Sequence, residues 1–198
     1  MRILLVNSGL RHGGAETQII YLCHAFVRLG HEVALYLLTP EADRKGDLPP
    51  EVRVIQGAKA SPFDLAEMKR LRRFIKEWRP DVVKAFLFDA NFYARTAAVG
   101  LGVPVLNGER NDGYQLNRNQ ALAHYPTRWL ADAVVANTHA GRAFGAACRA
   151  ISEASSMGAI RFTSSCCRAP GRSIWVPSSG SKSEALFTKQ SSGPVACV

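Results

Sequence analysis

The sequence predicts an α/β domain with a mostly parallel sheet and helices on both faces, followed by a disordered tail. Short apolar runs alternate with helical patterns over residues 1–147, an order that is typical of parallel sheets. The composition then shifts, because residues 1–145 hold two serines and one cysteine while residues 146–198 hold twelve serines and four cysteines. We therefore expect one domain over 1–147 and a Ser- and Cys-rich tail of low order over 148–198, with no recognisable domain in it.

The first elements follow from apolar spacing. Arg2–Val6 is an apolar run short enough for a fully buried strand. Apolar residues recur at helical spacing over Ala15–Leu29, and Gly30 fits the end of that helix. Glu32–Leu38 and Val52–Ile55 predict the second and third strands.

The next helix carries start and stop signals. We expect Ser61 to cap it, Pro62 to occupy its first position and Asp64 to lie near its positive end. Arg79-Pro80 ends the helix. The remaining strands expected are Asp81–Leu87, Val103–Asn107 and Ala133–Asn137, and the remaining helices are Asp89–Val99, Arg118–Leu130 with Pro126 inside it, and one from Thr138 to about Ala150.

Composition excludes several classes of protein. The chain has 198 residues, a net charge of +9 and 47% hydrophobic residues, enough apolar material for a core. It holds no apolar stretch of roughly 20 residues for a membrane span, and Ile3–Val6 is too short for a signal core. We expect a cytoplasmic protein. Adjacent Cys166 and Cys167 match zinc spacing poorly, so we expect no metal site.

One helix has a basic face that suggests a membrane surface as a partner. Lys69, Arg70, Arg73 and Lys76 lie opposite the apolar stripe of the helix that ends at Trp78. Such a face suits peripheral contact with anionic lipid, or it is an ordinary solvated face relieved by acidic residues at 67 and 77. No pattern of interleaved aromatic and basic residues indicates nucleic acid.

In parallel sheets, ligands bind beyond the carboxyl ends of the strands. The first such loop, Gly9–Glu16, lets backbone amides approach a phosphate, although Gly13 and Gly14 also fit a simple tight turn. The spacing is not GxGxxG and no acidic residue ends the second strand, which disfavours a dinucleotide-dependent oxidoreductase. Glu109–Asp112 follows the fifth strand, either as sugar- or phosphate-binding groups or as a solvated loop with an internal ion pair.

Six motifs in order resemble the family-4-type glycosyltransferases, the GT-B enzymes that transfer sugars from nucleotide donors. They are Gly13-Gly14-Ala15-Glu16, Arg79-Pro80-Asp81-Val82-Val83, Phe86-Leu87-Phe88-Asp89-Ala90-Asn91, Gly102-Val103-Pro104-Val105, Gly108-Glu109-Arg110-Asn111-Asp112, and Ala131–Thr138 with Ala140-Gly141-Arg142. The resemblance covers roughly residues 1–147 and implies the N-terminal, Rossmann-like, acceptor-side domain of a two-domain enzyme.

The resemblance also implies roles for individual residues. Gly13 and Gly14 would border the donor diphosphate. The acceptor-binding candidates are His12, Glu16, Asp89, Asn91, Arg110 and Asn111. The nucleotide sugar would be a substrate, and no cofactor is implied. Many relatives carry histidine near the fourth strand, where this chain has Lys84 and Phe86, so no catalytic residue is assigned.

The tail lacks the family's interdomain motif and donor domain, which leads us to expect a truncated or frameshifted enzyme. Reading the coding DNA in the other two frames after codon 146 tests this. The resulting hypothesis is a transferase of cell-surface polysaccharide synthesis that needs a donor-binding half and is inactive alone. The alternative is a non-catalytic binding module whose partner supplies the donor domain in trans.

Overall fold

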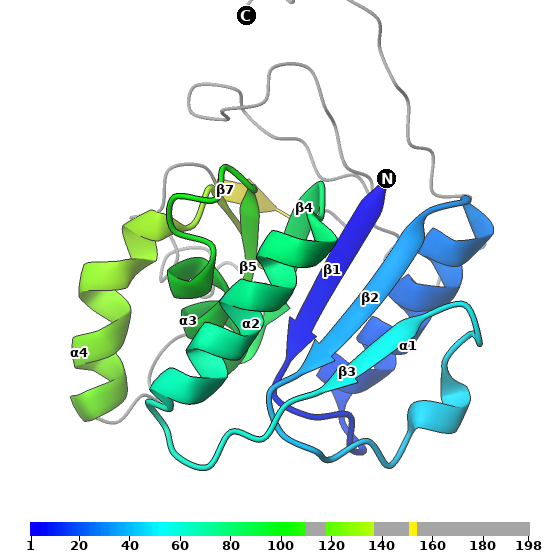
Figure 1. Ribbon diagram of the computed structural model, residues 1–198, viewed down its shortest axis with the longest axis horizontal. Coiled ribbons are helices and arrows are strands. Elements are labelled where there is room, and N and C mark those ends of the chain that lie inside the picture. The colour runs from blue at the N-terminus through cyan, green and yellow to red at the C-terminus, as the bar shows by residue number, and fades with distance from the viewer. Residues whose placement is uncertain (110–117, 137–150, 154–198) are drawn as a thin grey trace, which may run out of the picture.

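The computed structural model describes residues 1–109, 118–136 and 151–153. Within them, one seven-stranded sheet has the order β3-β2-β1-β4-β5-β6-β7, and every neighbouring pair is parallel (Figure 1). The strands are β1 (Arg2–Asn7), β2 (Glu32–Leu37), β3 (Arg53–Gln56), β4 (Val82–Phe86), β5 (Val105–Glu109), β6 (Ala133–Ala136) and β7 (Ile151–Glu153).

Helices cover both faces of this sheet, as the alternating pattern predicts. The helices are α1 (Gly14–Arg28), α2 (Leu65–Trp78), α3 (Leu87–Ala97) and α4 (Arg118–Thr127), with 3-10 turns η1 (Lys45–Asp47) and η2 (Arg128–Leu130). The helix α1 lies on one face, and α2, α3 and α4 lie on the other (Figure 1). No helix among the described residues is long and apolar enough to cross a membrane.

The central strand β1 divides the core into two. Ile3 and Leu5 pack in the cluster that contains α1, while Leu4 and Val6 pack in the cluster with α2 and α3. All four side chains are buried, because β1 lies between β2 and β4 and has helices on both sides. This is why its sequence is continuously apolar rather than alternating.

The start of α2 differs from the prediction. Asp64 is the N-cap residue, and its carboxylate accepts hydrogen bonds from the amides of Ala66 and Glu67. Ser61 and Pro62 lie outside the helix, so the expected cap at Ser61 is wrong. The reason is that Asp64 lies where its short side chain reaches the first free amides of the helix.

The expected helix start at Asp89 and strand end at Asn107 are also wrong. The helix α3 begins directly after β4 at Leu87, which adopts the left-handed φ of 64°. The strand β5 runs to Glu109, because Gly108 and Glu109 continue the pairing with β6. Glu109 is therefore a strand residue rather than part of a loop.

The sheet extends past residue 147. The strand β7 pairs with β6 in parallel and takes in three residues of the segment expected to be a disordered tail. The helix expected from Thr138, the pair Cys166-Cys167 and the segment from 154 onward lie outside the described residues.

Candidate functional site

The strand order has a switch point between β1 and β4. The chain leaves β1 for α1 on one face and leaves the neighbouring β4 for α3 on the other face. Loops that depart in opposite directions from adjacent strands leave a gap between them, the usual ligand position in such sheets. The N-termini of α1 and α3 therefore flank the β1–β4 switch point.

The glycine loop forms the α1 side of this site. Gly13 is the N-cap of α1, and no side chain caps the helix there. A Cβ at Gly13 would lie 2.3 Å from the Glu16 carboxylate, whereas a Cβ at Gly14 would meet nothing within 4 Å. Asn7, the last residue of β1, donates to the carbonyl oxygen of Gly9 at 2.7 Å and to Glu16 Oε1 at 3.4 Å. His12 is exposed.

The second side of the site is the beginning of α3. Its N-cap is Phe86, and again no side chain caps the helix. Asp89, in the first turn, forms an ion pair with Lys59, whose Nζ lies 2.5 Å from Asp89 Oδ2. Sequence reasoning missed Lys59, because a single lysine in a loop belongs to no pattern. Its position next to Asp89 depends only on the tertiary structure.

Asn91 is buried and bonded to the end of β5. Its Nδ2 donates to the Gly108 carbonyl and to Glu109 Oε1, both at 3.0 Å, and its Oδ1 accepts from the Gly108 amide at 3.1 Å. A Cβ at Gly108 would lie 2.8 Å from the Ala85 carbonyl oxygen, so only glycine fits under this contact. Asn91 thus ties α3 to the strand that leads toward Arg110.

Glu109 is a buried carboxyl group at the carboxyl end of β5. Burial raises the pKa of Glu109 from 4.5 to about 7, and the opposing effects come from the charge of Arg95, the hydrogen bond of Asn91 and the charge of Lys84. A carboxyl group with this pKa exists in both protonation states near neutral pH. The sequence placed Glu109 near the site but carried no signal of its burial.

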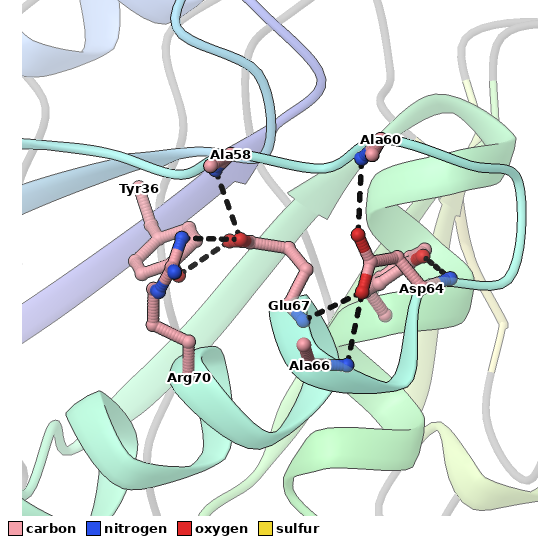
Figure 2. A network of polar contacts seen from close by, with 8 residues as sticks. Tyr36, Ala58, Ala60, Asp64, Ala66, Glu67 and Arg70 are labelled. Atoms are coloured by element: carbon pink, nitrogen blue, oxygen red, sulfur yellow. Dashed lines mark hydrogen bonds and ion pairs between the residues drawn. The ribbon is translucent and has the colours of Figure 1, made fainter.

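A second group of carboxylates holds the loop that carries Lys59. The amide of Ala58 donates to Glu67 Oε2 at 2.9 Å, and the amide of Ala60 donates to Asp64 Oδ2 at 3.0 Å (Figure 2). The amide of Lys59 itself bonds the carbonyl oxygen of Leu38. Three successive amides are therefore fixed, which sets the backbone position of Lys59.

Glu67 is also the partner of two other side chains. Its Oε1 accepts from the Tyr36 hydroxyl at 2.6 Å, and its Oε2 forms an ion pair with Arg70 at 2.9 Å (Figure 2). Only 1% of the Glu67 residue is exposed. Glu67 is therefore not an exposed charge on the basic face of α2, but its buried carboxylate does offset the charge of Arg70.

The structure gathers only some of the residues that the sequence singled out. Gly13, Gly14 and Glu16 lie at the start of α1, and Asp89 and Asn91 lie at the start of α3. Arg110 and Asn111 lie outside the described residues. The basic residues of α2 are exposed along that helix.

Comparison with known proteins decides the family. Residues 12–151 match the family model described as Glycosyltransferase Family 4. The chain belongs to this family. The matched residues include Gly13, Gly14, α3 and β5, whereas β1 precedes them.

Several solved structures have a similar fold, although their sequence identity to this chain is low. HepE from Anabaena in complex with UDP and glucose is similar with a TM-score of 0.60 at 16% identity, over 74% of this chain and 40% of that one. The lipopolysaccharide outer core galactosyltransferase WaaB, in its apo form, gives 0.56 at 17% identity, over 73% and 41%. A UDP-N-acetylglucosamine 2-epimerase from Rickettsia bellii gives 0.52 at 13%, over 74% and 41%.

These likenesses show the fold, and the epimerase among them indicates that the fold alone does not define the reaction. No curated protein matches the chain by sequence. The family 4 chain spans about 40% of the length of these solved structures. It corresponds to one Rossmann-like half of the GT-B architecture.

Proposed function

We propose that this family 4 chain is the acceptor-side half of a glycosyltransferase. The enzyme would transfer a sugar from a nucleotide-diphosphate donor to a glycan or a lipid-linked acceptor in cell-surface polysaccharide synthesis. The observation that carries the proposal is the pair of helix N-termini at the β1–β4 switch point, neither of which has a side-chain cap. Uncapped helix N-termini present amide donors and partial positive charge, which suit phosphate oxygens.

Gly13 and Gly14 would border the donor diphosphate. The space next to Gly14 supports this role, since a ligand can approach the backbone there without meeting a side chain. Negative charge grows on the leaving diphosphate during transfer, and amides aimed at that charge lower the barrier. The other half of the enzyme would make most of the contacts with the nucleotide.

The acceptor would lie on the α3 side of the switch point. Asp89 keeps part of its surface exposed and can accept hydrogen bonds from sugar hydroxyls, as can Glu16 and His12 at the glycine loop. Asn91 would act through the end of β5, since its amide bonds are made within the protein. Arg110 and Asn111 remain acceptor-binding candidates.

We also propose a cytoplasmic location with peripheral contact at the inner face of the membrane. Lys69, Arg70, Arg73 and Lys76 are all exposed on α2, and Glu77 is the one exposed acidic residue of that helix. Each basic residue near an anionic bilayer contributes about 1 kcal/mol of attraction at low ionic strength.

Titration of the ¹⁵N-labelled chain with UDP tests the phosphate assignment. We expect small, non-saturating shifts at the amides of Gly13 and Gly14, and no tight binding of NAD. Shifts confined to other parts of the sheet would refute the assignment. Tight saturable binding of a UDP- or GDP-sugar, or sugar transfer by this chain alone, would refute its restriction to the acceptor side.

The second candidate is a non-catalytic binding module with a donor-domain partner in trans. The chain spans about 40% of the length of the solved structures, which hold a second half as well. Co-purification of a separate donor-domain chain that restores transfer would support it over a single-chain enzyme.

A further inference from the structure

The helix α4 turns large apolar side chains toward the solvent and a polar side chain toward the protein interior. Leu122, Tyr125 and Trp129, which follow one another at helical spacing into η2, are 73%, 51% and 53% exposed. On the other side of the helix, His124 is buried. A helix that covers a sheet normally turns its apolar stripe inward, so this arrangement points to something apolar on the outside.

The groups beneath α4 explain why its apolar residues do not turn inward. Arg95 of α3 is buried, and its Nε donates to the Thr127 hydroxyl of α4 at 3.1 Å. Burial and the charges of Arg95 and Arg128 lower the pKa of His124 to about 4, so its ring is neutral at neutral pH. The interior side of α4 is a polar contact, not a hydrophobic core.

The outward side combines aromatic rings with a cation. The Arg128 guanidinium lies 5.2 Å from the ring centre of Tyr125 and 5.3 Å from that of Trp129. Tryptophan and tyrosine beside a basic residue are typical of the boundary between lipid headgroups and acyl chains, where one end of the ring is apolar and the other is hydrated.

Charge on a helix of the same sheet face indicates which apolar surface this stripe meets. Both α2 and α4 pack against α3 on the same face of the sheet (Figure 1). The exposed side of α2 carries four basic residues, of which Arg70 is ion-paired with the buried Glu67, and a single exposed acidic residue, so its net charge is positive. This charge complements an anionic lipid surface, whereas a second copy of the chain would bring like charges together.

We infer that the outward stripe of α4 and η2, formed by Leu122, Tyr125, Trp129 and Leu130, inserts into the headgroup region of an anionic bilayer. The inference extends the membrane contact proposed for α2 and gives it an apolar anchor. Basic residues attract the chain to the surface, and buried apolar side chains retain it there. It is independent of the nucleotide assignment at the glycine loop.

Binding of the full 198-residue chain to vesicles tests this inference. The variant is the triple change Leu122→Ser, Tyr125→Ser and Trp129→Ser, and the control is Tyr21→Ser. Tyr21 is 58% exposed on α1, on the opposite face of the sheet. Circular dichroism and thermal unfolding confirm that both variants are folded, which we expect because all the replaced side chains point outward.

We expect the wild-type chain and the Tyr21 variant to bind phosphatidylcholine–phosphatidylglycerol vesicles, and the triple variant to bind at least about tenfold more weakly. Lipids brominated near the headgroup should quench the fluorescence of Trp129, measured as the difference from Trp129→Phe. A double change, Lys69→Gln with Arg73→Gln, should weaken binding mainly at low salt.

Three results would overturn the inference. The triple variant binds as tightly as the wild type, and the contact is then made by α2 alone. The wild-type chain binds no vesicles, and the membrane contact is then absent while the UDP titration stands unaffected. The triple change converts a dimer to a monomer without altering vesicle affinity, and the stripe then meets a second copy of the chain.

Discussion

The N-terminus of α2 has a side-chain cap, whereas the N-termini of α1 and α3 have none. At α2, Asp64 caps the helix and Glu67 bonds a hydroxyl, an amide and a guanidinium, so both carboxylates have partners within the protein. At the switch point, Gly13 and Phe86 leave their helices uncapped. The difference teaches that conspicuous charged residues can be purely structural, while the candidate site consists of backbone amides left without a cap.

The largest effect on stability should come from Glu67. Replacing it by leucine leaves the Tyr36 hydroxyl and the Ala58 amide unpaired in a buried position, which we expect to lower the free energy of unfolding by about 3 kcal/mol. Urea unfolding measures the change. Glu77→Leu, at an exposed position of the same helix, is the matched control and should have no measurable effect. If both variants had a similar free energy of unfolding, Glu67 would not have the structural role that distinguishes the N-terminus of α2 from those of α1 and α3.

The pH dependence of stability should distinguish Glu109 from the carboxylates of α2. The pKa of Glu109 is about 7 in the folded chain against 4.5 for a free glutamate, so the folded state binds the proton more tightly. The contribution of Glu109 to the free energy of unfolding is therefore fully present below pH 4.5. It is lost as the pH rises through 7, by up to about 3 kcal/mol.

The measurement is the free energy of unfolding against pH for the wild type and Glu109→Gln. The difference between the two curves isolates Glu109, because His124, whose lowered pKa acts in the opposite direction, is present in both proteins. A difference that does not change between pH 4.5 and 7 would show that Glu109 titrates normally.

The smallest change in stability is expected at Gly14. A Cβ there meets nothing within 4 Å, and alanine favours a helix more than glycine does, so Gly14→Ala should leave stability equal or raise it by up to about 1 kcal/mol. The same variant should reduce the UDP-induced shifts at residues 13 and 14. A loss of stability of more than about 1 kcal/mol would mean that the glycine is needed for folding rather than for ligand approach.

The sequence predicted the strands and helices around the candidate site and missed several of the contacts among its side chains. The glycine loop and α3 were placed at strand ends because apolar periodicity and glycine spacing are visible in the chain itself. Ser61 was mistaken for a cap because the helix begins later than expected, where Asp64 bonds the amides of Ala66 and Glu67. Glu67 was mistaken for a surface charge, because its position on the helix does not reveal that Tyr36 and the loop after β3 lie above it.

By itself, the sequence determined the order of strands and helices, the parallel sheet and the family, since each rests on patterns that neighbouring residues carry. Only the tertiary structure decided which polar residues are paired. Lys59 and Asp89 are 30 residues apart, Tyr36 and Glu67 are 31 apart, and Asn91 and Glu109 are 18 apart. Pairing and burial set the charge and pKa of such groups, and both depend on contacts that exist only after the chain has folded.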